Sequence, residues 1–160
     1  LAQSNGNRHL RLIWGVLLEM RGQKESARRW WYETLQRYPD YVELREKLCN
    51  LENDLGHYAE AAQLAERGVE AAPSQLNLKY SLGRALYGLG RKQEALTQFD
   101  GILDLDPGYF LAGYSKGLVL LELGQRDAAR KAWLSAQEHI DMANPDVAES
   151  LRQGLKSLGP

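Results

Sequence analysis

Apolar residues in this chain recur at the three- and four-residue spacing of an amphipathic α-helix, and polar residues fill the positions between them. The same apolar stripe returns in successive segments of the sequence. On the first helix of each predicted unit it comprises Trp14, Leu48 and Leu82 together with Leu18, Leu86 and Leu120. Because such a stripe buries one face of a helix against its neighbours, we expect these side chains in the core.

Small residues and prolines repeat with a strict period of 34 residues. The three series are Gly22, Gly56, Gly90 and Gly124; Ala27, Ala61, Ala95 and Ala129; and Pro39, Pro73 and Pro107. A period of 34 is the repeat length of stacked helix-turn-helix arrays. Each glycine lies midway through its unit, where a left-handed backbone joins two antiparallel helices at low steric cost. The period therefore predicts an all-α solenoid of four helical hairpins.

The predicted fold is a single domain of residues 1–160, with repeats at about 8–41, 42–75, 76–109 and 110–143. We expect their helices at 8–21, 24–37, 41–55, 58–71, 75–89, 92–105, 109–123 and 126–142. Asp40 and Ser74 each follow a proline and are expected to cap the next helix. In the fourth unit the proline comes late, at Pro145, which predicts a second helix longer by about one turn. The apolar stripe of 146–158 predicts a terminal helix that caps the stack.

The small and large residues inside the helices have a packing explanation. At one equivalent site the first helices carry Gly15, Cys49, Gly83 and Gly117. At a matching site the second helices carry Trp31, Ala65, Phe99 and Trp133. We expect the small residues to let paired helices approach closely, and the large residues to fill the space between successive hairpins. Because Ala65 leaves volume unfilled, we predict that the second hairpin is the loosest joint.

Composition and charge favour a globular protein with a protein partner. Hydrophobic residues make up 44% of the chain, charged residues 26%, and the formal net charge is −1. The 20 basic and 21 acidic residues are interspersed, so no single-sign field would attract a nucleic acid or an anionic membrane. The longest apolar run, Leu10 to Leu18, contains Arg11 and is too short to span a bilayer. We therefore expect neither nucleic acid binding nor direct membrane insertion.

The sequence leaves the compartment open. A lone cysteine, Cys49, excludes an internal disulfide and a cysteine-based metal cluster. Exported proteins without disulfides are also common, so both the cytoplasm and the periplasm remain. The chain begins at Leu1 and not at methionine, from which we expect a truncated or processed start.

The residues that carry the period resemble those of the tetratricopeptide repeat family. The third unit reads Leu82-Gly83-x-x-Leu86, Gly90, Ala95-x-x-x-Phe99 and Pro107, and the first echoes it with Trp14-Gly15, Gly22, Ala27-x-x-x-Trp31 and Pro39. The resemblance covers nearly the whole chain. It departs from the family where the early tryptophan and the first-helix tyrosine are absent, and where the second unit carries Cys49, Glu52 and Ala65. The resemblance implies a right-handed superhelix whose first helices line a concave wall, and an adaptor or scaffold that holds a peptide or helix of another protein there.

The wall that this resemblance implies changes character along the chain. Its expected partner-binding residues are Glu46, Asn50, Tyr80, Arg84, Tyr87, Leu111, Tyr114, Leu118 and Leu121. The C-terminal half offers apolar anchors and tyrosine hydroxyls, which suits a binding hot spot. A second interpretation remains open at this point, in which some of these leucines pack inside the superhelix or against the final helix.

Catalytic interpretations find little support. His9, His57 and His139 lie far apart in the repeat order, with no nucleophile or carboxylate in register. The neighbours of Cys49 on its helix include Glu46 and Glu52, which would raise the pKa of the thiol. The 34-residue period explains the glycines better than a phosphate-binding motif does. We predict no enzyme, no catalytic or metal site and no cofactor.

Two alternative functions remain. The first is self-assembly through the uncapped N-terminal repeat, where Trp30 lies beside Trp31, with Tyr32 and Trp14 nearby. Exposed aromatic residues at an open end would form a homo-oligomeric contact. The second is a docking or regulatory arm of a larger enzyme, which only the start of the chain at Leu1 suggests.

Overall fold

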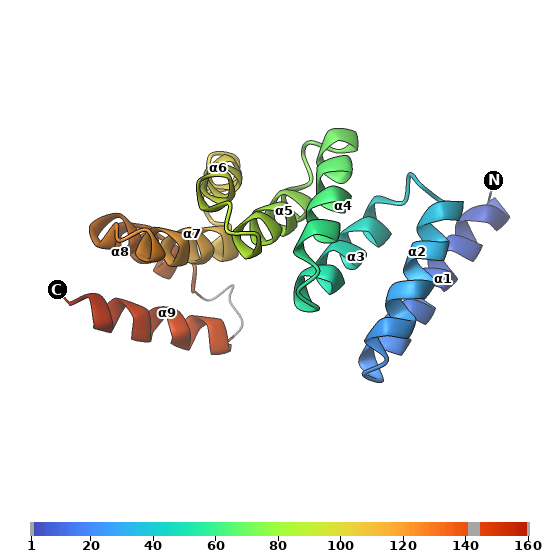
Figure 1. Ribbon diagram of the computed structural model, residues 1–160, viewed down its shortest axis with the longest axis horizontal. Helices are drawn as coiled ribbons and strands as arrows, with labels where there is room; N and C mark the ends of the chain where they lie inside the picture. Colours follow the sequence, from blue (N-terminus) through green and yellow to red (C-terminus); the bar gives the residue numbers. More distant parts are fainter. Residues whose placement is uncertain (1, 141–144, 160) are drawn as a thin grey trace. The chain divides into compact units, whose positions relative to one another are not determined.

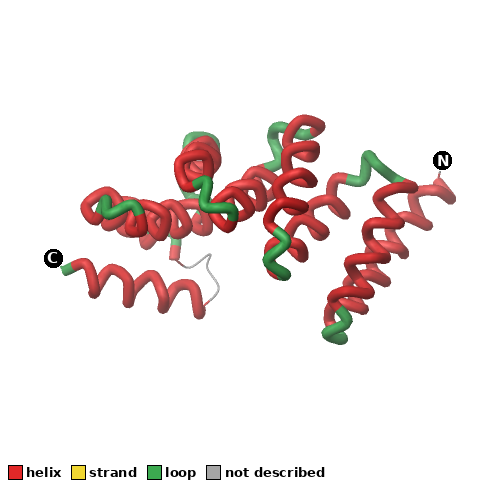
Figure 2. The backbone as a smooth tube through the Cα atoms, in the orientation of Figure 1, coloured by secondary structure: helices red, strands yellow, loops and turns green. Residues whose placement is uncertain are grey.

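The computed structural model describes residues 2–140 and 145–159, and side chains from residue 7 onward. Within these ranges the chain forms nine α-helices and no β-strand (Figures 1 and 2). The helices are α1 (Ala2–Met20), α2 (Lys24–Arg37), α3 (Val42–Asp54), α4 (Tyr58–Ala71), α5 (Leu76–Gly88), α6 (Lys92–Leu103), α7 (Phe110–Glu122), α8 (Arg126–Gln137) and α9 (Pro145–Leu158). The prediction of an all-α helical repeat fold is confirmed.

The chain divides into two compact units, Leu1–Ser81 and Leu82–Pro160. In the first unit α1 pairs with α2 and α3 with α4, and α2 packs against α3 (Figure 1). In the second unit α6 packs against α7, α7 against α8, and α8 against α9. Each hairpin turns at a glycine with a left-handed backbone: Gly22, Gly56, Gly90 and Gly124, with φ between 74° and 79°. The turn glycines that the period predicts are therefore confirmed.

Inside the hairpins, a large aromatic ring of the second helix fills the space that a glycine of the first helix leaves open. A Cβ added to Gly15 would lie 1.8 Å from Nε1 of Trp31, and one added to Gly117 would lie 2.1 Å from Nε1 of Trp133. Phe99 covers Gly83 in the same way, at 2.5 Å. The ring thus lies against the first helix of its own hairpin, and not only between hairpins as expected. The indole of Trp133 reaches the next helix as well, because Gly154 of α9 has no side chain to exclude it.

Several predicted boundaries are wrong. The first helix begins at Ala2, well before residue 8. The N-cap of α3 is Tyr41 and no side chain caps it, while α5 begins at Leu76, so Asp40 and Ser74 do not have the capping role expected of them. The helix α8 ends at Gln137, so the late proline does not lengthen it to residue 142; residues 141 and 142 themselves lie outside the described residues. Pro145 instead begins α9, where its fixed φ suits the first helical turn.

The buried stripe is also partly wrong on α1. Leu48, Leu82, Leu86 and Leu120 are buried as expected. Trp14 is 48% exposed and Leu18 is only partly buried. The reason is positional: α3 has α2 on one side and α4 on the other, whereas the described part of the chain packs only α2 closely against α1.

None of the helices in the described ranges combines the length and apolar character that crossing a membrane requires.

Candidate protein-binding site

An apolar stripe runs along one face of α7 in the second unit. It consists of Leu111, Tyr114, Leu118 and Leu121, which follow one another at helical spacing. Leu111 in the first turn is 37% exposed, and the other three side chains are partly buried. The four predicted residues of this helix therefore share one face that solvent still reaches.

The terminal helix α9 reduces the part of this stripe that solvent reaches. Phe110, Trp133, Ala136 and Leu151 form a buried cluster of α7, α8 and α9, and the three inner residues of the stripe pack against it. Tyr114 is fixed between two rings, with its centroid 6.2 Å from that of Phe110 and 6.3 Å from that of Trp133. Offset stacking of this kind stabilises the contact beyond the area it buries. The alternative that some of these residues pack with the final helix is therefore correct for part of their surface.

The second unit also has a group of polar side chains, which lie on α5, α6 and α7. The hydroxyl of Tyr87 donates a hydrogen bond to the carboxylate of Glu122, and Nζ of Lys92 lies 2.9 Å from the second oxygen of that carboxylate. The hydrogen bond from Tyr87, followed by that from Lys92, lowers the pKa of Glu122. Arg84 is half-buried one turn earlier on α5. Tyr87 is thus held in position by a charge-assisted hydrogen bond.

The predicted residues of the first unit form a separate, polar group. Nδ2 of Asn77 donates to Glu46 at 2.9 Å, and the Ser81 hydroxyl donates to Oδ1 of Asn50 at 2.8 Å. These bonds join α3 to the start of α5, where Tyr80 is half-buried. Glu46 and Asn50 therefore already have partners within the chain.

Sequence analysis missed a buried carboxylate network in the first unit. Glu52 is fully buried, and its two oxygens lie 2.8 and 3.0 Å from Nε of Arg28 on α2. Nδ1 of His57 lies 2.8 Å from the same carboxylate. Burial first, and then a hydrogen bond to Glu52, raise the pKa of Tyr32. The available signal was that Glu52 replaces a leucine, because the equivalent positions of the other repeats are Leu18, Leu86 and Leu120.

Cys49 behaves as a core residue. Its thiol is completely buried, and burial is the main cause that raises its pKa to about 12. The acidic neighbours Glu46 and Glu52 contribute in the expected direction, while Arg45 opposes them. Among the described residues, no group of three or more histidine, cysteine, aspartate or glutamate side chains could hold a metal ion.

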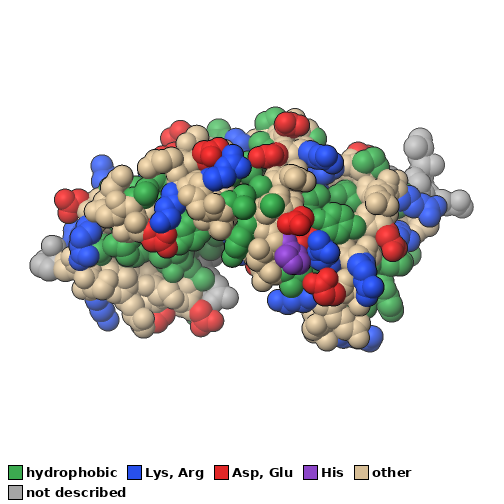
Figure 3. Space-filling view, viewed as in Figure 1, with side chains coloured by type: hydrophobic (Ala, Val, Ile, Leu, Met, Phe, Trp, Pro, Cys, Tyr) green, Lys and Arg blue, Asp and Glu red, His purple; other side chains and the backbone are tan. Residues whose placement is uncertain are grey.

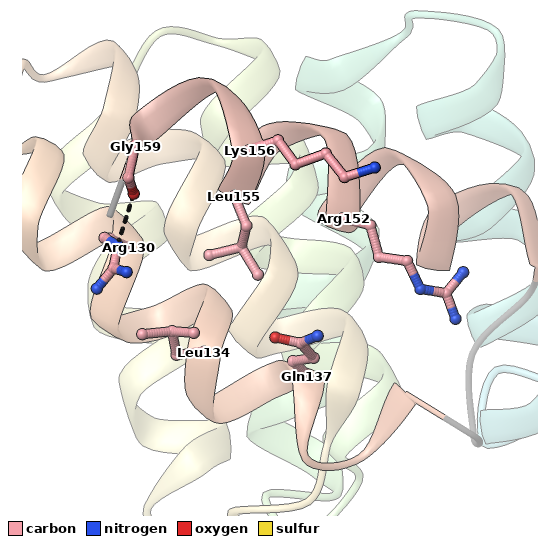
Figure 4. A pocket seen from close by; sticks show the side chains of 7 residues that line it. All are labelled: Arg130, Leu134, Gln137, Arg152, Leu155, Lys156 and Gly159. Carbon is pink, nitrogen blue, oxygen red and sulfur yellow. Dashed lines mark hydrogen bonds between the residues drawn. The ribbon is translucent and has the colours of Figure 1, made fainter.

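A second surface feature is a cleft of about 510 Å³ between α8 and α9. In Figure 4, Leu155 of α9 points toward Leu134 of α8, while Arg152 and Lys156 extend outward from α9. Nε of Arg130 donates to the carbonyl oxygen of Gly159 at 3.1 Å and closes one end. The cleft thus has an apolar floor and a basic rim.

Charges on the molecular surface are mixed. Figure 3 shows acidic and basic side chains interspersed over the face in view. This agrees with the distribution along the sequence and gives that face no field of a single sign.

Comparison with known proteins identifies the family. Residues 50–110 match the model of the tetratricopeptide repeat. Residues 50–110 therefore belong to the tetratricopeptide repeat family. Over 92 residues the chain is 28% identical to human tetratricopeptide repeat protein 7B, and this alignment covers 58% of this chain and 11% of that protein. It is 26% identical over 129 residues to the CTR9 homolog of Arabidopsis thaliana, covering 80% and 12%. The chain thus spans about a tenth of the length of these relatives.

Solved tetratricopeptide repeat structures share the fold. TTC0263, a thermophilic protein of this family from Thermus thermophilus, superposes with a TM-score of 0.81 at 23% identity, covering 95% of this chain and 83% of that one. A MamA crystal structure superposes with a TM-score of 0.75 at 22% identity, covering 94% and 85%. Tetratricopeptide repeats are generally non-enzymatic modules for protein–protein interaction, which indicates protein partners for this chain.

Proposed function

We propose that this chain is an adaptor or scaffold that binds an extended or helical segment of a partner protein. The binding surface is the first-helix face of the second unit: Arg84 and Tyr87 on α5, and Leu111, Tyr114, Leu118 and Leu121 on α7. The observation that supports this proposal most directly is the apolar stripe of α7, which stays open to solvent even though α9 packs along part of it. Catalysis is no part of the proposed function.

The side chains of this face indicate which kind of segment the partner would offer. Leu111, Leu118 and Leu121 provide a surface for apolar anchors, since burying such side chains is the main favourable term in association. Tyr114 and Tyr87 are held rigid by stacking and by the Glu122 hydrogen bond, so they lose little conformational entropy when a ligand binds. In the first unit, Glu46, Asn50 and Tyr80 stay proposed contacts for a basic or polar part of the partner.

A peptide display library panned on the 160-residue chain tests this function. We expect selected peptides to carry apolar anchors and to lose binding at least tenfold when Leu111 is replaced in Leu111→Glu. The matched control is Leu105→Glu, because Leu105 is 62% exposed, lies beyond the end of α6 and is not one of the proposed contacts. Peptides that bind Leu111→Glu as tightly as the parent chain would refute the proposed surface.

A further inference from the structure

A cleft of about 340 Å³ lies between α6, α7 and α8 in the second unit. Leu103 of α6 and Leu120 of α7 form part of its apolar wall, and Ala128 and Ala132 line it on α8. This volume is near the lower end of the range for ligand pockets and gives room for one large side chain. By helical spacing, the α7 residues that line the cleft lie on a different face of that helix from the apolar stripe.

The internal repeats show that small residues of the fourth hairpin open this cleft. Ala132 is equivalent to Gln98, Leu64 and Trp30, which lie one, two and three periods earlier. In the first hairpin the indole of Trp30 packs on α1, where its Nε1 donates to the carbonyl oxygen of Arg11 at 2.7 Å. A large side chain is therefore compatible with the fold at this position, and the fourth repeat does without one.

The second repeat has the same cleft in a smaller form. A cleft of about 120 Å³ there is lined by residues that include Glu60, Gln63, Leu64 and Arg67. Two periods later these four positions line the larger cleft as Ala128, Lys131, Ala132 and Ser135. Three longer side chains are thus replaced by alanine or serine where the cleft is larger.

A lysine of α7 lines this cleft at a position that is apolar in the other repeats. Lys116 is equivalent to Trp14, Leu48 and Leu82, and both leucines are buried. The side chain of Lys116 is 30% exposed, and its Nζ lies 2.5 Å from Oδ1 of Asp100 on α6. Packing of the repeat does not require a charge here, and such departures from the local pattern are expected at functional sites.

Lys131 of α8 provides a second amine on the same cleft. It is exposed, and its equivalents in the second and third repeats are the uncharged Gln63 and Thr97. The described residues that line the cleft include no carboxylate. Asp100 is paired across the contact of α6 with α7, and Asp127, one turn before Lys131, lines a different cleft. Partly exposed ion pairs contribute little, so the existing pair does not exclude a second carboxylate.

We propose that this cleft binds an acidic segment of a partner protein, which inserts one large apolar side chain and places a neighbouring carboxylate at Lys116 and Lys131. The inference goes beyond the proposed function, because the cleft and the apolar stripe lie on different faces of α7. Burial in the apolar walls favours the inserted side chain, and charge-assisted hydrogen bonds from the amines favour the carboxylate. A basic segment would bring like charges together. The charge of the lining therefore selects an acidic partner.

Alanine-methyl NMR of the full 160-residue chain tests the proposal, because Ala128 and Ala132 line the cleft. The probe is the capped peptide acetyl-Asp-Phe-Asp-amide. We expect it to shift the methyl signals of Ala128 and Ala132 until they saturate, and to leave those of Ala27 and Ala61, buried in the first unit, unchanged. Two control peptides, acetyl-Asn-Phe-Asn-amide and acetyl-Asp-Ala-Asp-amide, lack the charge or the anchor and should each bind about fivefold more weakly.

Two variants that restore residues of the second repeat locate the site. Ala132→Leu and Lys131→Gln introduce the residues of positions 64 and 63, and each should weaken binding of the probe about fivefold. Lys131 is exposed, so Lys131→Gln keeps the fold even if Ala132→Leu does not. The matched control is Lys47→Gln, which removes one positive charge from the exposed surface of α3 and should bind as the parent does.

Four results would each overturn the proposal. The first is the absence of a saturable shift at peptide concentrations up to about 10 mM. The second is equal binding of the neutral and the acidic peptide, which would remove the role of the lysines. The third is a set of shifts that leaves Ala128 and Ala132 unaffected. The fourth is a loss for Lys47→Gln as large as that for Lys131→Gln, which would show a general attraction between charges and no site.

Discussion

Gly117 on α7 lies directly beneath the indole of Trp133 on α8, so close that a Cβ at residue 117 would be 2.1 Å from Nε1 of the ring. The same nitrogen donates a hydrogen bond to the carbonyl oxygen of Tyr114 at 2.9 Å. The first hairpin repeats this arrangement, with Trp31 donating to the carbonyl oxygen of Leu12 at 3.3 Å. In these two hairpins the tryptophan ring therefore requires a residue without a side chain at the facing position.

The first prediction concerns this close approach. Gly117→Ala should lower the free energy of unfolding by about 3 kcal/mol, because the added methyl group must displace a buried indole from its hydrogen bond. The measurement is urea denaturation followed by circular dichroism. The matched control is Gly101→Ala in α6, where a Cβ meets nothing within 4 Å. That change should stabilise the protein by about 0.5 kcal/mol through helix propensity, and a loss as large as that of Gly117→Ala would contradict the explanation.

The second prediction concerns the buried Glu52. Arg28→Ala removes the guanidinium whose Nε reaches both oxygens of the Glu52 carboxylate, and it should cost about 3 kcal/mol of unfolding free energy, since a buried charge is then left without its main compensation. Urea denaturation measures the loss. Arg91→Ala is the control, because its pair with Glu94 is exposed and contributes little; an equal loss in the two variants would show that the burial of Glu52 has no special effect.

Restoring the residue of the other repeats extends this test. The double variant Glu52→Leu with Arg28→Ala should recover most of the stability that Arg28→Ala loses, because leucine fills the same site in the other three repeats. Failure to recover would mean that the carboxylate is needed for the local backbone and not only tolerated there.

The third prediction concerns Cys49. Its pKa of about 12 lies above that of an unfolded thiol, so the folded state favours the protonated form. The corresponding stability is fully present below about pH 9 and is lost as the pH rises toward 12. At pH 8 we expect a disulfide reagent to modify Cys49 at least a hundredfold more slowly in the folded chain than in urea. Equal rates would show that the thiol is accessible.

The fourth prediction concerns the contact of α9 with the last hairpin. Leu151 is fully buried in the cluster with Phe110 and Trp133, so Leu151→Ala should destabilise the second unit by about 3 kcal/mol. Hydrogen exchange should show the loss of protection first in α9. Leu134→Ala is the control, since Leu134 is 41% exposed on α8 and should change little; equal effects would place α9 outside the core.

The sequence predicts most of the fold because its period is a packing requirement. The left-handed backbone at Gly22 restricts that position to glycine, and so does a ring packed against Gly15 or Gly117; these restrictions recur with the period. Helix ends restrict the residue type less. The helix α3 begins after Tyr41, which makes no side-chain capping bond, and α8 ends at Gln137. No capping residue in the sequence indicates either boundary.

The candidate site was less predictable, because burial depends on neighbours that are distant in sequence. The expected wall places Leu118 and Leu121 in the open, yet both pack against the buried cluster to which α9 contributes Leu151. The place of Trp14 in the apolar stripe predicts a core residue, yet its side chain is 48% exposed on α1. That the four repeats form one domain, and that the second hairpin is the loosest joint, stay predictions.

The sequence alone thus determined the family, the number of hairpins and the turn glycines, because each depends on local volume and backbone conformation repeated every 34 residues. Only the tertiary structure decided which apolar side chains stay exposed. Leu10 and Leu44 occupy equivalent positions, but one is 68% exposed and the other is completely buried. The exposed fraction of each side chain depends on which helices pack beside it, and the sequence of a single repeat does not specify those helices.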